Sequence, residues 1–123
     1  MHSVSGTLAS MAALPYAIAA RVAYAHRPCV AFVGDGGFSM LLAEFATRVK
    51  YKEPVNLVVV KNNTLGMIKC EQMVFLCNPE YGCELRPIDF AAFALICGGT
   101  ASRSKTPATA PRFWTRPSRR RSR

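Results

Sequence analysis

The sequence predicts an α/β fold in which helices flank a parallel sheet. Two short apolar runs, residues 28–33 and 55–60, are rich in β-branched residues and have the length of buried strands. Between them, residues 38–51 repeat apolar side chains at helical spacing, which predicts an amphipathic helix packed on the sheet. A strand, a helix and a second strand in this order form a βαβ unit with parallel strands and a right-handed crossover.

Helices are also predicted on both sides of this unit. Residues 5–25 are rich in Ala, Leu, Met and Ile, and Pro15 is expected to start or kink that helix. Residues 66–76 predict a further helix that Asn78-Pro79 interrupts, and residues 88–97 predict another, which ends at Gly98-Gly99.

The composition describes one globular domain at most. The chain has 123 residues, of which half are hydrophobic, and this is short for an α/β enzyme. We find neither an apolar stretch of membrane-spanning length nor the basic start and apolar core of a secretory signal. The five cysteines include no CxxC pair, which disfavours a zinc site or a disulfide framework. We therefore expect a cytoplasmic protein without a membrane partner.

Nearly all of the net charge of +9 lies at one end of the chain. The 16 Lys and Arg residues are divided equally between residues 1–100 and 101–123, whereas all seven Asp and Glu residues lie in the first segment. The body is therefore nearly neutral. We predict a folded domain over residues 1–100 and a basic, disordered tail over residues 101–123, where helical periodicity disappears.

Polar turns follow both predicted strands. Gly34-Asp35-Gly36-Gly37 comes directly after the first strand, and Asn62-Asn63 follows the second, so that Asp35 and Asn62 lie 27 positions apart. Parallel strands bring such turns together at one edge of the sheet, where open α/β sheets bind ligands. Carboxylate and amide oxygens suit Mg²⁺, and the glycines leave backbone N–H groups open to a phosphate. The pattern indicates a site for Mg²⁺ and a diphosphate.

The segment from Gly34 to Asn63 resembles the signature of thiamine diphosphate-dependent enzymes, a GDG followed by paired asparagines. The resemblance extends over about residues 5–100, through the strings SM, LPYAIAA, GDGGFSM and KNNTLGMIK. These strings are similar to the C-terminal cofactor domain of acetolactate synthases and pyruvate oxidases.

The resemblance implies a role for each matching position. The Mg²⁺ ligands would be the side chains of Asp35 and Asn62 and the main-chain carbonyl of Thr64. Glu71 would be a catalytic residue on the substrate side. The residues in contact with thiamine diphosphate would be Met11, Gly34, Asp35, Gly36, Gly37, Asn62, Thr64, Leu65, Gly66, Met67 and Ile68. Among these, Met11 would support the bent cofactor, and Ile68 would line the substrate side.

The resemblance also implies an activity, which is decarboxylation of a 2-oxo acid such as pyruvate and transfer of the remainder to an acceptor. FAD is used by some members of the family. Such enzymes are homo-oligomers in which a glutamate on a pyrimidine-binding domain activates the cofactor, and this sequence lacks that domain. We therefore expect the chain to be a fragment, incomplete at its C-terminus, that is inactive alone.

Two other functions compete with this interpretation. The chain could be a non-catalytic module that pairs with a full-length relative. It could also bind nucleic acid through the tail, since eight cations without acids attract phosphate in a salt-dependent way. The tail contains few aromatic residues, so we disfavour nucleic acid and regard residues from about 101 as out-of-frame or fused sequence.

Overall fold

The structure is a computed structural model that describes the backbone of residues 7–104 and the side chains of residues 11–104. It divides into two compact units, with the boundary between Ile88 and Asp89. The first unit contains the sheet and the second contains the helix that follows. The predicted tail begins at residue 101, and its residues 105–123 lie outside the described part, so its disorder stays a prediction.

The sheet of the first unit has two parallel strands, β1 (Cys29–Gly34) and β2 (Val55–Val60). Cys29 pairs with Val55 and Gly34 pairs with Val60, so the strands run in register and end together. The predicted α/β fold with a parallel sheet is therefore confirmed. The two polar turns emerge side by side, because both follow the carboxyl ends of neighbouring strands.

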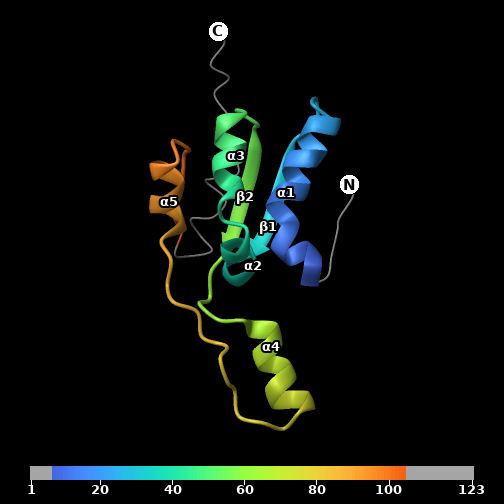
Figure 1. The fold of residues 1–123 in the computed structure, drawn as a ribbon, viewed down its shortest axis with the longest axis vertical. Coiled ribbons are helices and arrows are strands. Elements are labelled where there is room, and N and C mark those ends of the chain that lie inside the picture. Colours follow the sequence, from blue (N-terminus) through green and yellow to red (C-terminus); the bar gives the residue numbers. More distant parts are fainter. Residues whose placement is uncertain (1–6, 105–123) are drawn as a thin grey trace. The chain divides into compact units, whose positions relative to one another are not determined.

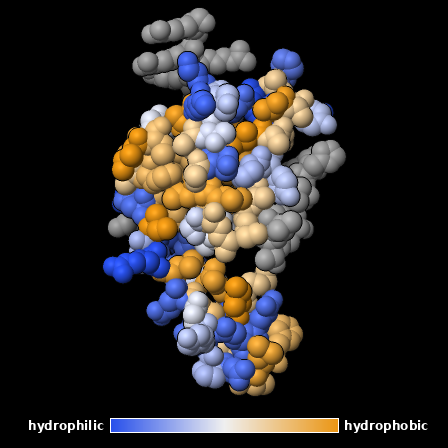
Figure 2. Space-filling view, viewed as in Figure 1, coloured by the Kyte–Doolittle hydropathy of each residue, from blue (hydrophilic) through white to orange (hydrophobic). Residues whose placement is uncertain are grey.

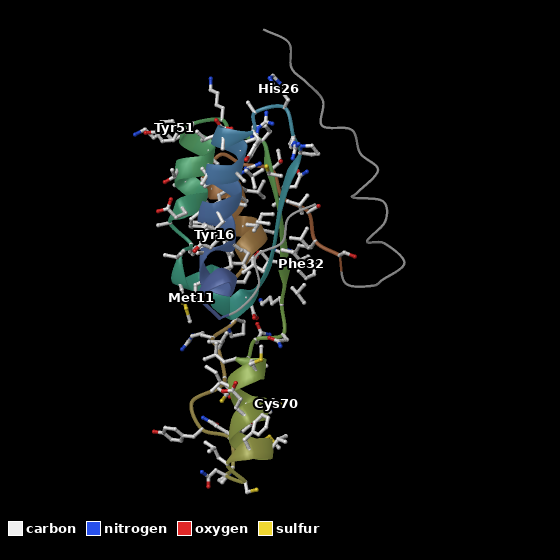
Figure 3. All side chains as sticks on the ribbon, turned by 90° about the vertical axis from the view of Figure 1, so that its right-hand side faces the viewer. Met11, Tyr16, His26, Phe32, Tyr51 and Cys70 are labelled. Carbon is white, nitrogen blue, oxygen red and sulfur yellow. The ribbon has the colours of Figure 1, made fainter. Side chains whose placement is uncertain are left out.

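The first helix, α1 (Thr7–Ala23), packs on β1 and contains Pro15 in its interior rather than at its start. A proline inside a helix removes one backbone hydrogen bond. Together with α3 (Glu44–Lys50), α1 lies on one face of the sheet, whereas Phe32 lies on the opposite side (Figure 1, Figure 3).

The prediction of one continuous helix over residues 38–51 is wrong. The segment contains two helices, α2 (Asp35–Met40) and α3, which a turn at residues 41–43 separates (Figure 1). Leu41 leaves the helical conformation with φ −123° and ψ 35°, and its N–H donates to the carbonyl of Phe38, three residues back. The turn changes the helix direction while Phe38 and Phe45 both stay buried. Apolar spacing alone does not reveal such a break.

The core of the first unit lies between the sheet and these helices. Alternate residues of each strand face the helices, and the paired strands add their inward side chains to the same layer. The buried apolar residues of this layer are Leu14, Ala17, Ala31, Val33, Phe38, Phe45 and Val55. On the other face of the sheet, Val30, Phe32 and Val60 are exposed.

After β2 the chain makes an excursion that we call the arm, residues 66–82. It contains α4 (Gly66–Cys70) and the π-helix η1 (Glu71–Phe75), so the predicted helix over residues 66–76 is present. The chain then returns to a one-residue antiparallel bridge between Thr64 and Glu84, which closes the arm at its base. Hydrophobic side chains lie among hydrophilic ones on this part of the surface (Figure 2). The exposed large ones are Met67, Ile68, Met73, Val74, Phe75, Leu76 and Tyr81.

The second unit contains α5 (Phe90–Ile96), in agreement with the predicted helix over residues 88–97. Asp89 caps the helix by accepting the N–H of Ala92 at 3.0 Å and also pairs with Arg103. The Ala92 N–H and then the Arg103 charge hold the pKa of Asp89 below its ordinary value. The helix ends at Ile96, and Gly98 follows two residues later with a φ of +81°. Within residues 7–104, none of the helices has the length and apolar character that crossing a membrane requires.

Candidate functional site

Asp35 is a buried carboxylate at the point where β1 passes into α2. Only 4% of the residue is exposed, and it is the buried polar residue among the described side chains. Gly34 precedes it in an extended conformation and caps α2 without a side chain. An ordinary turn residue would be exposed to solvent. The burial of Asp35 therefore distinguishes its carboxylate from that of a solvated turn residue.

Backbone N–H groups from both strand ends hold this carboxylate. Its Oδ2 atom accepts the N–H groups of Asn62 at 3.1 Å and of Asn63 at 2.6 Å. Its Oδ1 atom accepts the N–H of Gly36 at 3.0 Å. Because an ionised carboxylate offers about four lone-pair sites, Oδ1 keeps free acceptor capacity after these three bonds. Asp35 therefore joins the two predicted turns directly.

Asn62 and Thr64 form the second part of the cluster. The side-chain oxygen of Asn62 accepts the N–H of Thr64 at 3.1 Å, which is an Asx turn. Asn63, between them, has a φ of +58°, a left-handed conformation that asparagine tolerates better than most residues. The loop therefore turns sharply just after β2 and brings the side-chain amide of Asn62 next to the backbone of Thr64.

The bridge at the base of the arm orients the carbonyl group of Thr64. Leu65 donates its N–H to Cys83, and Leu85 donates its N–H to Asn63, so these bonds flank the Thr64 and Glu84 pair. In such a non-hydrogen-bonded pair, the N–H and C=O groups of both residues point away from the opposite strand. The Thr64 carbonyl is thus directed to the side on which its N–H meets the Asn62 amide.

The glycines of the cluster allow close approach by the loop after β2. A Cβ atom at Gly36 would lie 2.7 Å from a methyl group of Leu65 and 3.1 Å from one of Leu85. A Cβ atom at Gly66 would lie 3.4 Å from the Asn62 amide nitrogen. Gly37 follows in the same short helix. Gly36, Leu65 and Gly66 are therefore neighbours of the Asp35 and Asn62 pair.

The other predicted residues lie further from this cluster. Met67 and Ile68 are exposed on α4, and Glu71 is exposed at the start of η1. Met11 is half-buried near the end of α1 that packs against α2 (Figure 3). In the described part of the chain, these four residues form no hydrogen bond or ion pair with Asp35 or Asn62, so their predicted roles remain predictions.

The donor set of the cluster consists of oxygen atoms. A carboxylate, a side-chain amide and a main-chain carbonyl are hard ligands of the kind that Mg²⁺ and Ca²⁺ take. Within the described residues, no group of three or more His, Cys, Asp and Glu side chains could hold a metal ion. The oxygen atoms of this donor set suit a hard divalent cation.

The residues that brace the loop were not predicted from the sequence. Cys83 and Leu85 reach the cluster through a bridge one residue long, which is too short for strand periodicity to reveal. Gly82, with a φ of +68°, marks the turn before them. That glycine is the sequence signal that predicts a reversal here.

Comparison with protein families supports the resemblance that these motifs carry. Residues 1–112 match the family described as "Thiamine pyrophosphate enzyme, C-terminal TPP binding domain". The match covers most of the chain, including both polar turns. The chain belongs to this family and corresponds to its thiamine pyrophosphate-binding domain.

Individual relatives agree with the family. The protein YdaP of Bacillus subtilis (strain 168) is 44% identical over 112 residues, which is 89% of this chain and 19% of YdaP. Pyruvate oxidase of Lactiplantibacillus plantarum is 40% identical over 94 residues, which is 76% of this chain and 16% of that enzyme. The chain thus spans less than a fifth of the length of these relatives.

A solved structure shares the fold. The thiamine diphosphate-dependent 4-hydroxybenzoylformate decarboxylase of Rhodococcus jostii RHA1 superposes with a TM-score of 0.73 and 25% sequence identity. The superposition covers 82% of this chain and 19% of the decarboxylase. The parallel sheet with flanking helices is therefore the thiamine diphosphate-binding fold.

Proposed function

We propose that this domain binds thiamine diphosphate through a magnesium ion, and that Asp35, the Asn62 side chain and the Thr64 carbonyl are the protein ligands of that ion. The Asp35 Oδ1 atom is the carboxylate oxygen with remaining acceptor capacity. It would therefore face the metal, while Oδ2 keeps its bonds to the backbone of Asn62 and Asn63.

The observation that carries this proposal is the burial of Asp35 without a cation. Among the described side chains, the ion pairs join Arg21 to Glu53, Lys69 to Glu80 and Arg103 to Asp89, and none of them includes Asp35. A buried charge is costly unless another charge or hydrogen bonds compensate it. Three N–H bonds provide part of the compensation, and a divalent cation at Oδ1 would provide the rest.

The remaining residues would surround the cofactor as the family resemblance implies. The backbone of Gly36, Gly37 and the segment 65–67 would hold the diphosphate, with Gly34 and Ile68 at the borders. Met11 would support the bent cofactor, and Glu71 would face the substrate. The position of Gly36 against Leu65 supports the first part, because a Cβ atom at Gly36 would lie 2.7 Å from a Leu65 methyl group and would push the loop away.

The cofactor would supply the carbanion-stabilising chemistry that decarboxylation of a 2-oxo acid requires. We propose a 2-oxo acid decarboxylase or synthase as the complete enzyme, similar to pyruvate oxidase or acetolactate synthase and with FAD as a further cofactor in some relatives. Activity would need a pyrimidine-binding domain, supplied by a longer chain or by a homo-oligomeric partner. This chain alone would bind the cofactor and not turn over substrate.

Calorimetric titration of the 123-residue chain with thiamine diphosphate tests the proposal. Binding is expected with Mg²⁺ present and is expected to disappear when EDTA removes the metal. Asn62→Ala removes one metal ligand and leaves the Asp35 carboxylate in place, so it should weaken binding about tenfold or more.

Asn56→Ala provides a matched control, because Asn56 is an exposed asparagine within β2 and away from its carboxyl end. The Asn56→Ala variant should bind thiamine diphosphate in the presence of Mg²⁺ with the affinity of the wild type. Equal binding with and without metal, or an equal loss in both asparagine variants, would contradict the proposed magnesium site.

A further inference from the structure

The arm contains a set of side-chain bonds that lead to the proposed magnesium site. Gln72, the second residue of η1, is half-buried and faces the segment that returns to the sheet. Its amide nitrogen donates to the carbonyl of Tyr81 at 3.1 Å, and its amide oxygen accepts the Tyr81 N–H at 2.8 Å. The Gln72 side chain thus bonds both the N–H and the carbonyl group of Tyr81, as the backbone of a neighbouring strand would.

The same amide oxygen also reaches Cys83. The buried Cys83 thiol, which is 2% exposed, lies 3.3 Å from the Gln72 oxygen and 3.5 Å from the Tyr81 carbonyl. The π-helical turn accompanies this arrangement, since Leu76 donates its N–H to Glu71 and Asn78 donates its N–H to Gln72. Such wide turns are often found at functional sites.

Cys83 in turn fixes the ligand loop. Its carbonyl accepts two bonds from the loop, the Leu65 N–H at 2.8 Å and the Thr64 hydroxyl at 3.1 Å. Thr64 provides the carbonyl that we assign to the metal, and the bridge to residues 83–85 determines where that carbonyl points. Gln72 is therefore connected to the ligand loop through one residue, Cys83, although it does not touch Asp35 or Asn62 in any bond of the described structure.

We propose that Gln72 is a positioning residue for the magnesium site. By holding Tyr81 and Cys83, it keeps residues 83–85 against the loop and aims the Thr64 carbonyl at the metal. This inference rests on the proposed function. Partners of this kind, one step removed from the ligands, commonly change metal affinity by about 10–100-fold when they are lost.

A second side-chain interaction on the arm serves as a comparison. Lys69 and Glu80 form an ion pair, and the bond to Glu80 holds the pKa of Lys69 above its ordinary value. Both side chains are partly exposed, and exposed ion pairs contribute little to stability. Glu80 also lies before Tyr81 and does not contact residues 83–85 through this pair, so its loss should leave the ligand loop unchanged.

The test is amide hydrogen exchange together with Mg²⁺ affinity in the presence of thiamine diphosphate, measured on the full chain. In Gln72→Ala, we expect the Leu65 and Leu85 amides to exchange at least about tenfold faster and the Mg²⁺ dissociation constant to rise about tenfold. The amides that pair β1 with β2 should exchange as in the wild type. Glu80→Gln should match the wild type in all three readouts.

Three further variants separate positioning from loss of folding. Gln72→Glu keeps the oxygen that accepts from Tyr81 and Cys83, and should restore part of the Leu65 protection. Thr64→Val removes the hydroxyl bond to Cys83 but keeps the main-chain carbonyl, and should weaken Mg²⁺ binding by about threefold, whereas Thr64→Ser should not.

Unchanged exchange and affinity in Gln72→Ala would overturn the inference, as would equal acceleration of the β1 and β2 amides, which would indicate general destabilisation. If the wild-type chain binds no Mg²⁺ with thiamine diphosphate, the proposed function fails. Exchange at Leu65 and Leu85 then still decides whether Gln72 holds the loop.

Discussion

The ligand cluster and the arm are neighbours in the chain and are held by different means. In the cluster of Asp35, Asn62 and Thr64, a buried carboxylate and a side-chain amide bind backbone N–H groups at the ends of two paired strands. The arm, residues 66–82, exposes much of its apolar surface and is tied to the loop mainly through Gln72 and the bridge at Thr64. Polar bonds thus fix the positions of the proposed metal ligands, whereas the apolar side chains of the arm stay exposed.

The largest effect is expected where the cluster is most buried. Asp35→Asn should lower the free energy of unfolding of the metal-free chain by about 2–3 kcal/mol, because an amide group has one acceptor oxygen for three N–H donors. Urea unfolding followed by circular dichroism would measure it. Asn62→Ala loses only the bond to Thr64 and should cost about 1 kcal/mol. Equal losses in the free energy of unfolding for Asp35→Asn and Asn62→Ala would contradict the proposal that the Asp35 carboxylate holds the two strand ends together.

The smallest effect is expected on the arm. Phe75 is 77% exposed, so Phe75→Ser should change the free energy of unfolding by less than about 0.5 kcal/mol. The same urea titration measures it, and light scattering should show less self-association because an exposed aromatic side chain has been removed. A loss of more than 2 kcal/mol would contradict the difference between the cluster and the arm, since Phe75 would then belong to a core.

Sequence patterns predicted the strands and the meeting of Asp35 with Asn62, because strand length, parallel pairing and the turns after each strand are local features. They did not predict the turn at residues 41–43, since Phe38 and Phe45 keep helical spacing on either side of it. Gln72 and Cys83 were also not predicted, because their roles depend on a reversal at Gly82 and on single bonds between distant residues. Periodicity contains no information about such bonds.

The most direct test of the magnesium site is to locate a paramagnetic ion in the folded chain. Mn²⁺ would replace Mg²⁺ in the presence of thiamine diphosphate, and amide signals would be recorded by nuclear magnetic resonance. We predict that signals of residues 35–37 and 62–65 broaden first, while those of Cys29 and Val55, at the opposite ends of the strands, persist. Broadening centred on the exposed carboxylates Glu71 and Glu80, with residues 35–37 unaffected, would contradict the site.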